Sequence, residues 1–296
     1  MWAVAVLAVV VTYSRISAQD LYNVSGGGLE GGLGRALVFV GYPTALVALA
    51  VLLVVFGRLG RTAERVAAVV SAALCATIVF PGVVDQGDLD GRPVNALAAA
   101  GVAIALVLTV VAVVRGGLGR PLPFGGSDVI RIAIAAFLFL VSLPWFAAEL
   151  GFYLDGVPVV GSIFMSGEVI TEGGETAAAV HLGDHHGTDG ILLAWTALAL
   201  SRTVPTMPSA PRRTVLVFYL CLMLVYGLAL ALEDFWHEQL VKRDVTSLRL
   251  PNMIRPDISP AWGALLAVAA VLAVFALRYA PSDHARSDAR TRRLRR

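Results

Sequence analysis

Charged residues are scarce in this chain, and their scarcity is the first guide to its class. Asp, Glu, Lys and Arg make up only 15% of the 296 residues, and lysine occurs once, at Lys242. Soluble globular proteins carry about 25% charged residues and about 45–50% apolar residues, whereas hydrophobic residues reach 57% here. This balance excludes an ordinary soluble domain and indicates a membrane protein.

Cysteine is also scarce, and the common catalytic motifs are missing. Cys75 and Cys221 both fall within apolar runs, so we interpret them as packing residues and not as a disulfide or a metal pair. The sequence has no phosphate-binding glycine loop, no nucleophile elbow and no HExxH zinc motif. The arginine-rich C-terminal stretch lacks interleaved aromatic residues, so nucleic-acid binding is not predicted.

Long apolar runs are what the chain does have, and they predict an all-α, polytopic transmembrane helical bundle of about eight spans. Most runs approach or exceed the ~20 residues needed to cross hydrocarbon. The weakest is the first, because its apolar core Trp2–Thr12 is as short as a signal-peptide core, although it lacks the basic residues that precede one. The predicted spans are residues 1–14, 36–57, 64–84, 94–115, 128–151, 177–201, 214–236 and 260–279.

The distribution of arginine predicts the orientation of the bundle. Of the 23 basic residues, 16 fall on the side that holds the C-terminal tail and the connections after the second, fourth and sixth spans. The positive-inside rule therefore places both termini in the cytoplasm and the chain in the plasma (inner) membrane. We expect one transmembrane domain, residues 1–280, and a basic, disordered cytoplasmic tail, residues 281–296. The outer loops are predicted at residues 15–35, 85–93, 152–176 and 237–259.

A polar decapeptide, residues 181–190, interrupts the sixth predicted span. Its sequence is His-Leu-Gly-Asp-His-His-Gly-Thr-Asp-Gly, and ionisable residues at or inside a bilayer are costly and are therefore functional candidates. The apolar stretch after it is too short to span alone, so the span is expected to begin near Ala177. On one continuous helix His181 and His185 share a face, and Asp189 lies one turn further along it. Glycines 183, 187 and 190 would permit close helix contact or would let the backbone unwind around a bound ion.

Two other predicted spans carry acids or histidine to the same depth. The seventh ends with Glu233 and His237 at a spacing of four residues, and the fifth ends with Glu149. Sets of His, Glu and Asp on neighbouring helices are what helical bundles use to bind zinc, iron, manganese or copper. We predict His181, His185, His237 and Asp189 as metal ligands, with Glu149 or Glu233 as a further ligand or a general base. Glu238, Lys242 and Arg243 are expected to form a solvated helix end.

The spacing of the histidines in the decapeptide resembles one histidine box of the membrane desaturases and hydroxylases. That family binds two irons through several such boxes on the cytoplasmic side, whereas this chain has five histidines in all, one of them in the tail. The activity of that family is therefore not inferred.

Three hypotheses about function remain open. The first is an outward-facing metal site, in which the metal activates water or binds a redox substrate if the protein is an enzyme. The second is a transporter that uses the same groups as a proton or cation relay. The third is a non-catalytic membrane subunit that binds a partner through its outer loops. The lipid bilayer is the one partner that the composition itself predicts.

Overall fold

The computed structural model describes residues 7, 32–80, 95–116, 122–149, 158, 169–172, 175–178, 186–241, 243–253 and 256–279. The predicted tail, the outer loop 85–93 and, apart from Leu7, the predicted first span lie outside these residues. The helices of the described part are α3 Gly32–Val55, α4 Thr62–Cys75, α5 Asn95–Gly116, α6 Gly126–Glu149, α8 His186–Ser201, α9 Ala210–Trp236 and α10 Pro260–Tyr279. Short 3₁₀ helices, η1 Phe56–Arg58, η2 Ala76–Val79 and η3 Val204–Thr206, continue or join them, and η4 His237–Val241 is a π-helix.

The helices are those of a membrane protein in length and composition. Five described stretches are long and apolar enough to cross a bilayer, and each begins or ends within a few residues of a predicted span. They are Thr62–Val79, Ala96–Gly116, Gly126–Leu143, Ala210–Val241 and Pro260–Arg278. α3 and α8 also contain apolar runs, so seven of the eight predicted segments overlap helices of the described part, the sixth only from His186 onward. The total of eight spans and the orientation of the termini stay predictions.

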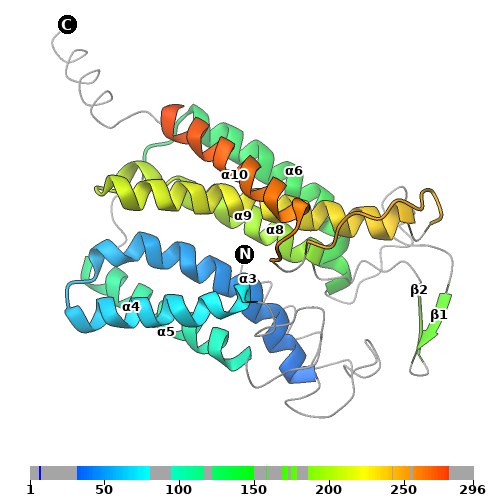
Figure 1. The fold of residues 1–296 in the computed structure, drawn as a ribbon, viewed down its shortest axis with the longest axis horizontal. Coiled ribbons are helices and arrows are strands. Elements are labelled where there is room, and N and C mark those ends of the chain that lie inside the picture. Colours follow the sequence, from blue (N-terminus) through cyan, green and yellow to red (C-terminus); the bar gives the residue numbers. More distant parts are fainter. Residues whose placement is uncertain are drawn as a thin grey trace, which may run out of the picture.

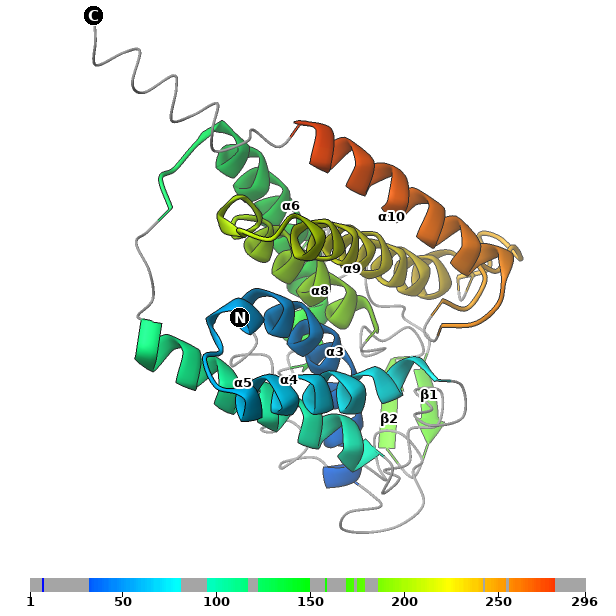
Figure 2. The same ribbon diagram turned by 60° about the vertical axis from the view of Figure 1, so that its left-hand side comes forward.

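The helices form two groups that meet along α3 (Figures 1 and 2). α3, α4 and α5 pack on one another, and α8, α9 and α10 form a second group with α6 on the outer side of α8. α3 contacts both α8 and α9 and thereby joins the groups. The main apolar core lies along this junction, and a smaller one forms around Leu138, Ile191 and Trp195 where α6 meets α8.

α9 is the most buried of the five long apolar spans in the described part of the chain. Half of its apolar span is buried, against 17–28% of the other four spans. Large apolar side chains lie on the outward surfaces of α5, α6 and α10, for example Leu106, Phe137 and Phe275. Exposed apolar surface of this extent is unfavourable in water and favourable against lipid tails. The surface of the bundle is therefore suited to contact with a lipid bilayer.

α8 and α9 approach closely through a reciprocal pair of glycines. A methyl group added at Gly190 would collide with the carbonyl oxygen of Gly227, and one added at Gly227 would collide with that of Gly190. Both helices are therefore in backbone contact at this crossing, as small residues permit in membrane bundles. The prediction of close helix contact is confirmed for Gly190.

The start of the sixth predicted span is wrong. Residues 175–178, which were expected to begin or precede a helix, form strand β2 (Glu175–Ala178), which pairs antiparallel with β1 (Val169–Glu172). The helix, α8, begins only at His186 and has 16 residues. β-branched residues such as Val169, Ile170 and Thr176 favour strand over helix. The predicted outer loop 152–176 thus contains part of a hairpin, and the predicted loop 237–259 begins as helix, because η4 extends α9 to Val241.

Candidate functional site

Arginines are concentrated at one end of the bundle. We call the end of the bundle that holds the turns α3–α4 and α8–α9 the arginine end, since Arg58, Arg61, Arg202, Arg212 and Arg213 lie there. The opposite end, which includes the β-hairpin, is called the acidic end (Figure 1). α6 ends there at Glu149, α8 begins there, and α9 ends there.

The length of α9 indicates how deep Glu233 would lie in a bilayer. The helical rise from Arg213 to Glu233 is about 30 Å, which matches the thickness of the hydrocarbon core. If Arg213 lies at one boundary of the bilayer, Glu233 lies at the other. On that placement the residues that follow Glu233 would lie in the headgroup layer, where water and ions are available.

Glu233 and His237 form the centre of the candidate site. The Nδ1 atom of His237 lies 2.9 Å from Oε1 of Glu233, and the two side chains are 26% and 9% exposed. The spacing of four residues brings the two side chains onto one helix face, as the sequence predicted. The carboxylate fixes the imidazole ring and directs the other ring nitrogen, Nε2, away from Glu233. A neutral imidazole held in this way presents one lone pair to a metal ion or a proton.

More polar groups are buried around this pair than the sequence predicted. Asp234, Glu238 and Gln239 are 4%, 2% and 6% exposed. The prediction that Glu238 lies at a solvated helix end is therefore wrong. Within the described part of the chain, the buried Nε2 of Gln239 and Oγ1 of Thr188 have no hydrogen-bond partner. Buried polar atoms without partners are rare in proteins and often mark sites that hold water or a ligand.

The end of α9 is held by a local turn. η4 is a π-helix, a geometry that occurs mostly as a single turn and often at functional sites. The chain then reverses at Asp244, whose φ of 56° is in the left-handed region. The amides of Asp244 and Val245 donate to the carbonyls of Val241 and Leu240, at 3.0 and 2.9 Å. Further along, the indole of Trp236 donates to the carbonyl of Leu248 at 2.8 Å, so the returning chain lies against α9.

A second polar group lies deeper in the bundle, between α3, α8 and α9. The hydroxyls of Tyr42 and Tyr226 are 3.0 Å apart, and both side chains are buried. The carboxylate of Asp189, in the first turn of α8, interacts electrostatically with both hydroxyls, and Glu233 does so with that of Tyr226. The ring of Tyr226 packs against that of Trp262, with 5.1 Å between the centroids. The tyrosine pair joins residues 184 positions apart, and nothing in the sequence pattern indicates it.

The predicted site residues are only partly brought together by the described structure. Glu233, His237 and Asp189 lie at the acidic end, with Asp189 deeper than the other two. Glu149 is the last residue of α6, at the same end, and its side chain lies outside the described part of the structure. His181 and His185 lie outside the described residues. Within the described ranges, no group of three or more His, Cys, Asp or Glu side chains is arranged to hold a metal ion.

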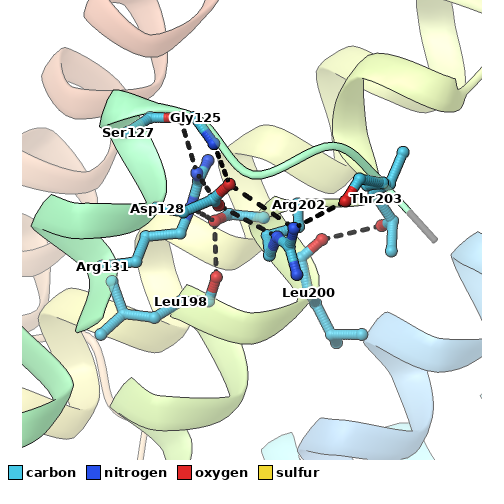
Figure 3. A network of polar contacts seen from close by, with 10 residues as sticks. Gly125, Ser127, Asp128, Arg131, Leu198, Leu200, Arg202 and Thr203 are labelled. Carbon is cyan, nitrogen blue, oxygen red and sulfur yellow. Dashed lines mark hydrogen bonds and ion pairs between the residues drawn. The ribbon is translucent and has the colours of Figure 1, made fainter.

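The arginine end has a polar network of its own, centred on Asp128 of α6 (Figure 3). Arg131 and Arg202 each place a guanidinium nitrogen 3.0 Å from Oδ1 of Asp128. Arg131 also donates to Oγ of Ser201 at 2.7 Å, and Arg202 donates to the carbonyl of Leu122 at 3.2 Å. These bonds tie the start of α6 to the end of α8. We interpret the network as structural, because each carboxylate oxygen already accepts from guanidinium or backbone donors.

The described part of the chain is a helical bundle with a polar region at each end, and its long apolar helices are compatible with a multi-pass membrane protein. No protein-family model, no curated protein and no solved structure matches the chain.

Proposed function

We propose that this protein binds a divalent transition metal ion, Zn, Fe, Mn or Cu, at the extracytoplasmic face of the plasma membrane. The observation that supports the proposal is the 2.9 Å contact between Nδ1 of His237 and the carboxylate of Glu233. Histidines that bind metals almost always donate their second ring nitrogen to a carboxylate, a carbonyl or water. In this arrangement Nε2 of His237 is the ligand and Glu233 is a positioning residue.

The other ligands in the proposal are His181 and His185, which precede α8 in the sequence. Gly190 faces Gly227, so Asp189 lies level with the residue after Gly227 and about 8 Å nearer the bilayer centre than Glu233. The three histidines therefore form a better ligand set than one that includes Asp189. Three histidines and an open position are typical of a catalytic zinc site, where the metal lowers the pKa of bound water. Glu149 would then be the candidate general base.

The test is the metal content of the purified protein. We expect about one equivalent of a transition metal after mild detergent extraction without chelator, measured by inductively coupled plasma mass spectrometry. His237→Ala should abolish stoichiometric binding. Glu233→Gln should lower the affinity by about 10- to 100-fold, which is typical for loss of a positioning carboxylate. His284→Ala, which changes a histidine in the arginine-rich tail, is the matched control and should retain the wild-type metal content.

Two results would overturn the proposal. One is wild-type protein without bound metal that also fails to bind added Zn, Fe, Mn or Cu at micromolar concentration. The other is equal metal content in His237→Ala, His284→Ala and the wild type, which would place the metal elsewhere.

A further inference from the structure

The turn between α3 and α4 brings together arginine side chains from three elements. It consists of Gly57, Arg58 and Leu59, at the arginine end of the bundle (Figure 1). Arg65, in α4, donates from Nε to the carbonyl of Leu59 at 3.0 Å. Arg212, in α9, lies against Gly57, because a methyl group added at Gly57 would come 2.5 Å from its Nη1 atom. Arg58 lies between the two contacts and is exposed. We call Arg58, Arg65 and Arg212 the turn arginines.

The positive charge of the turn arginines is not balanced by acids. Within the described residues, no carboxylate forms an ion pair with any of the three. Glu64 and Asp128 are the acids described at this end, and each is already held by two other arginines (Figure 3). Arg212 stands in the first turn of α9, which has no acid and where the helix dipole disfavours a cation. An anion from outside the chain would therefore stabilise this cluster.

The arrangement of the guanidinium groups is suited to a phosphate group. A guanidinium is planar and can bind phosphate through two parallel hydrogen bonds. The bond to Leu59 fixes Arg65 through Nε and uses neither of its Nη groups. Gly57 and Leu59 are two residues apart, which is about 8 Å at most along the chain. The side chains that contact them can therefore both bind a single headgroup.

The turn arginines lie where apolar surface begins. Arg65 and Arg212 stand in the first turn of the apolar spans of α4 and α9, and both helices pack on α3. Val69 follows Arg65 at a spacing of four residues, and Val215 follows Arg212 at a spacing of three, so each valine shares a helix face with its arginine. Both valines are exposed. A molecule that binds the arginines through phosphate thus finds apolar surface beside them for acyl chains.

We propose that the turn arginines bind the headgroup phosphate of an anionic phospholipid in the leaflet at the arginine end. The guanidinium groups donate hydrogen bonds to the phosphate oxygens, and the acyl chains lie along the exposed valines of α4 and α9. Basic pockets between transmembrane helices bind anionic headgroups in this way. A zwitterionic lipid carries its own ammonium group and would leave the excess positive charge unbalanced. The proposal goes beyond the metal site, which lies at the opposite end of the bundle, and does not depend on it.

The test is the affinity of the delipidated protein for added phosphatidylglycerol, measured in mild detergent by native mass spectrometry. One phosphatidylglycerol should bind more tightly than any further copy, and phosphatidylcholine should bind more weakly. Arg212→Gln should weaken the first binding step about fivefold, and Arg65→Gln/Arg212→Gln about 25-fold, as expected for ~1 kcal/mol per arginine. Arg278→Gln, which changes an exposed arginine at the end of α10, is the matched control and should retain the wild-type affinity.

Gly57→Ala tests the position of the Arg212 guanidinium without changing the charge. The added methyl group would displace the far end of a flexible side chain, which can move while the fold is retained. We expect a loss of affinity for phosphatidylglycerol similar to that of Arg212→Gln. Gly60→Ala is the matched control in the same connection, because a methyl group there meets no atom within 4 Å. It should bind phosphatidylglycerol as the wild type does.

Four results would each overturn the proposal. The first is equal affinity for phosphatidylcholine and phosphatidylglycerol. The second is an equal loss in Arg278→Gln and Arg212→Gln, which would mean that only the overall charge matters. The third is equal affinity of Gly57→Ala and Gly60→Ala. The fourth is displacement of the lipid by millimolar inorganic phosphate, which would make the turn a site for a soluble anion. Metal binding at His237 could fail in its own assay without changing any of these readouts.

Discussion

The reciprocal contact of Gly190 and Gly227 provides the sharpest quantitative prediction. A methyl group at Gly190 meets the backbone of α9 at a distance that real Cβ atoms do not adopt, and backbone cannot rotate away as a side chain does. The two helices must separate, and such overpacking costs about 1–3 kcal/mol. We therefore expect Gly190→Ala to destabilise the bundle although alanine is the better helix former.

The matched control is Gly263→Ala. Gly263 is also in a helix, α10, and a methyl group added there meets no atom within 4 Å. Replacing glycine by alanine in a helix favours folding by up to about 1 kcal/mol, and this gain is common to both variants. The difference between the variants, about 1–3 kcal/mol, therefore isolates the collision. At roughly 2–4 °C per kcal/mol it corresponds to several degrees in Tm.

The assay is a thermal-shift measurement on detergent-solubilised, monodisperse protein. Gly190→Ala and Gly227→Ala should each unfold below Gly263→Ala. The double variant Gly190→Ala/Gly227→Ala should cost less than the sum, because one separation of the helices relieves both collisions. Equal Tm values for Gly190→Ala and Gly263→Ala would refute the backbone contact between α8 and α9.

Three further predictions concern other contacts. Tyr42→Phe and Tyr226→Phe should each cost about 0.5–1.5 kcal/mol, and the double variant should cost less than the sum, because the two hydroxyls share one hydrogen bond. Fully additive losses in a thermal-shift assay would mean that this shared bond contributes little. Asp244→Gly should raise the free energy of unfolding by up to about 1 kcal/mol, and with it the Tm, since glycine adopts a φ of 56° without strain. A Tm equal to or below the wild type would contradict this. Asp128→Asn should lower the Tm more than Asp257→Asn in the exposed segment before α10, since it removes the carboxylate that both Arg131 and Arg202 contact; similar values would show that the network contributes little.

Local features of the structure could be predicted from the sequence, and features between distant residues could not. The Glu233–His237 contact follows from a spacing of four residues on one helix, and the positions of α9 and α10 follow from apolar length. The burial of Glu238 could not be predicted, because helical periodicity does not indicate what covers the end of α9. The partners of Asp128 include Arg202, 74 positions away, and the Tyr42–Tyr226 pair joins different ends of the chain. The pattern of apolar runs along the sequence does not indicate which polar residues contact one another inside the bundle.

The late start of α8 was missed for a related reason. The apolar stretch after Thr188 is short for a span. The sequence therefore predicted a longer helix that also includes the decapeptide. The chain instead uses a helix of 16 residues and surrounds it: α3, α6 and α9 all contact α8. Length rules apply to helices that face lipid, and α8 is screened from lipid by its neighbours.

The shortness of α8 also bears on how the chain enters the membrane. A 16-residue helix falls below the ~20 residues that cross hydrocarbon unaided, and Asp189 in its first turn makes insertion costlier still. α9, which is long and apolar, follows after a short connection that contains η3. The two helices are therefore expected to insert together as a hairpin, in which Gly190 and Gly227 are in backbone contact. During synthesis α8 would stay at the membrane surface until α9 has been made. The unit that inserts into the membrane is then the α8–α9 hairpin and not the single helix.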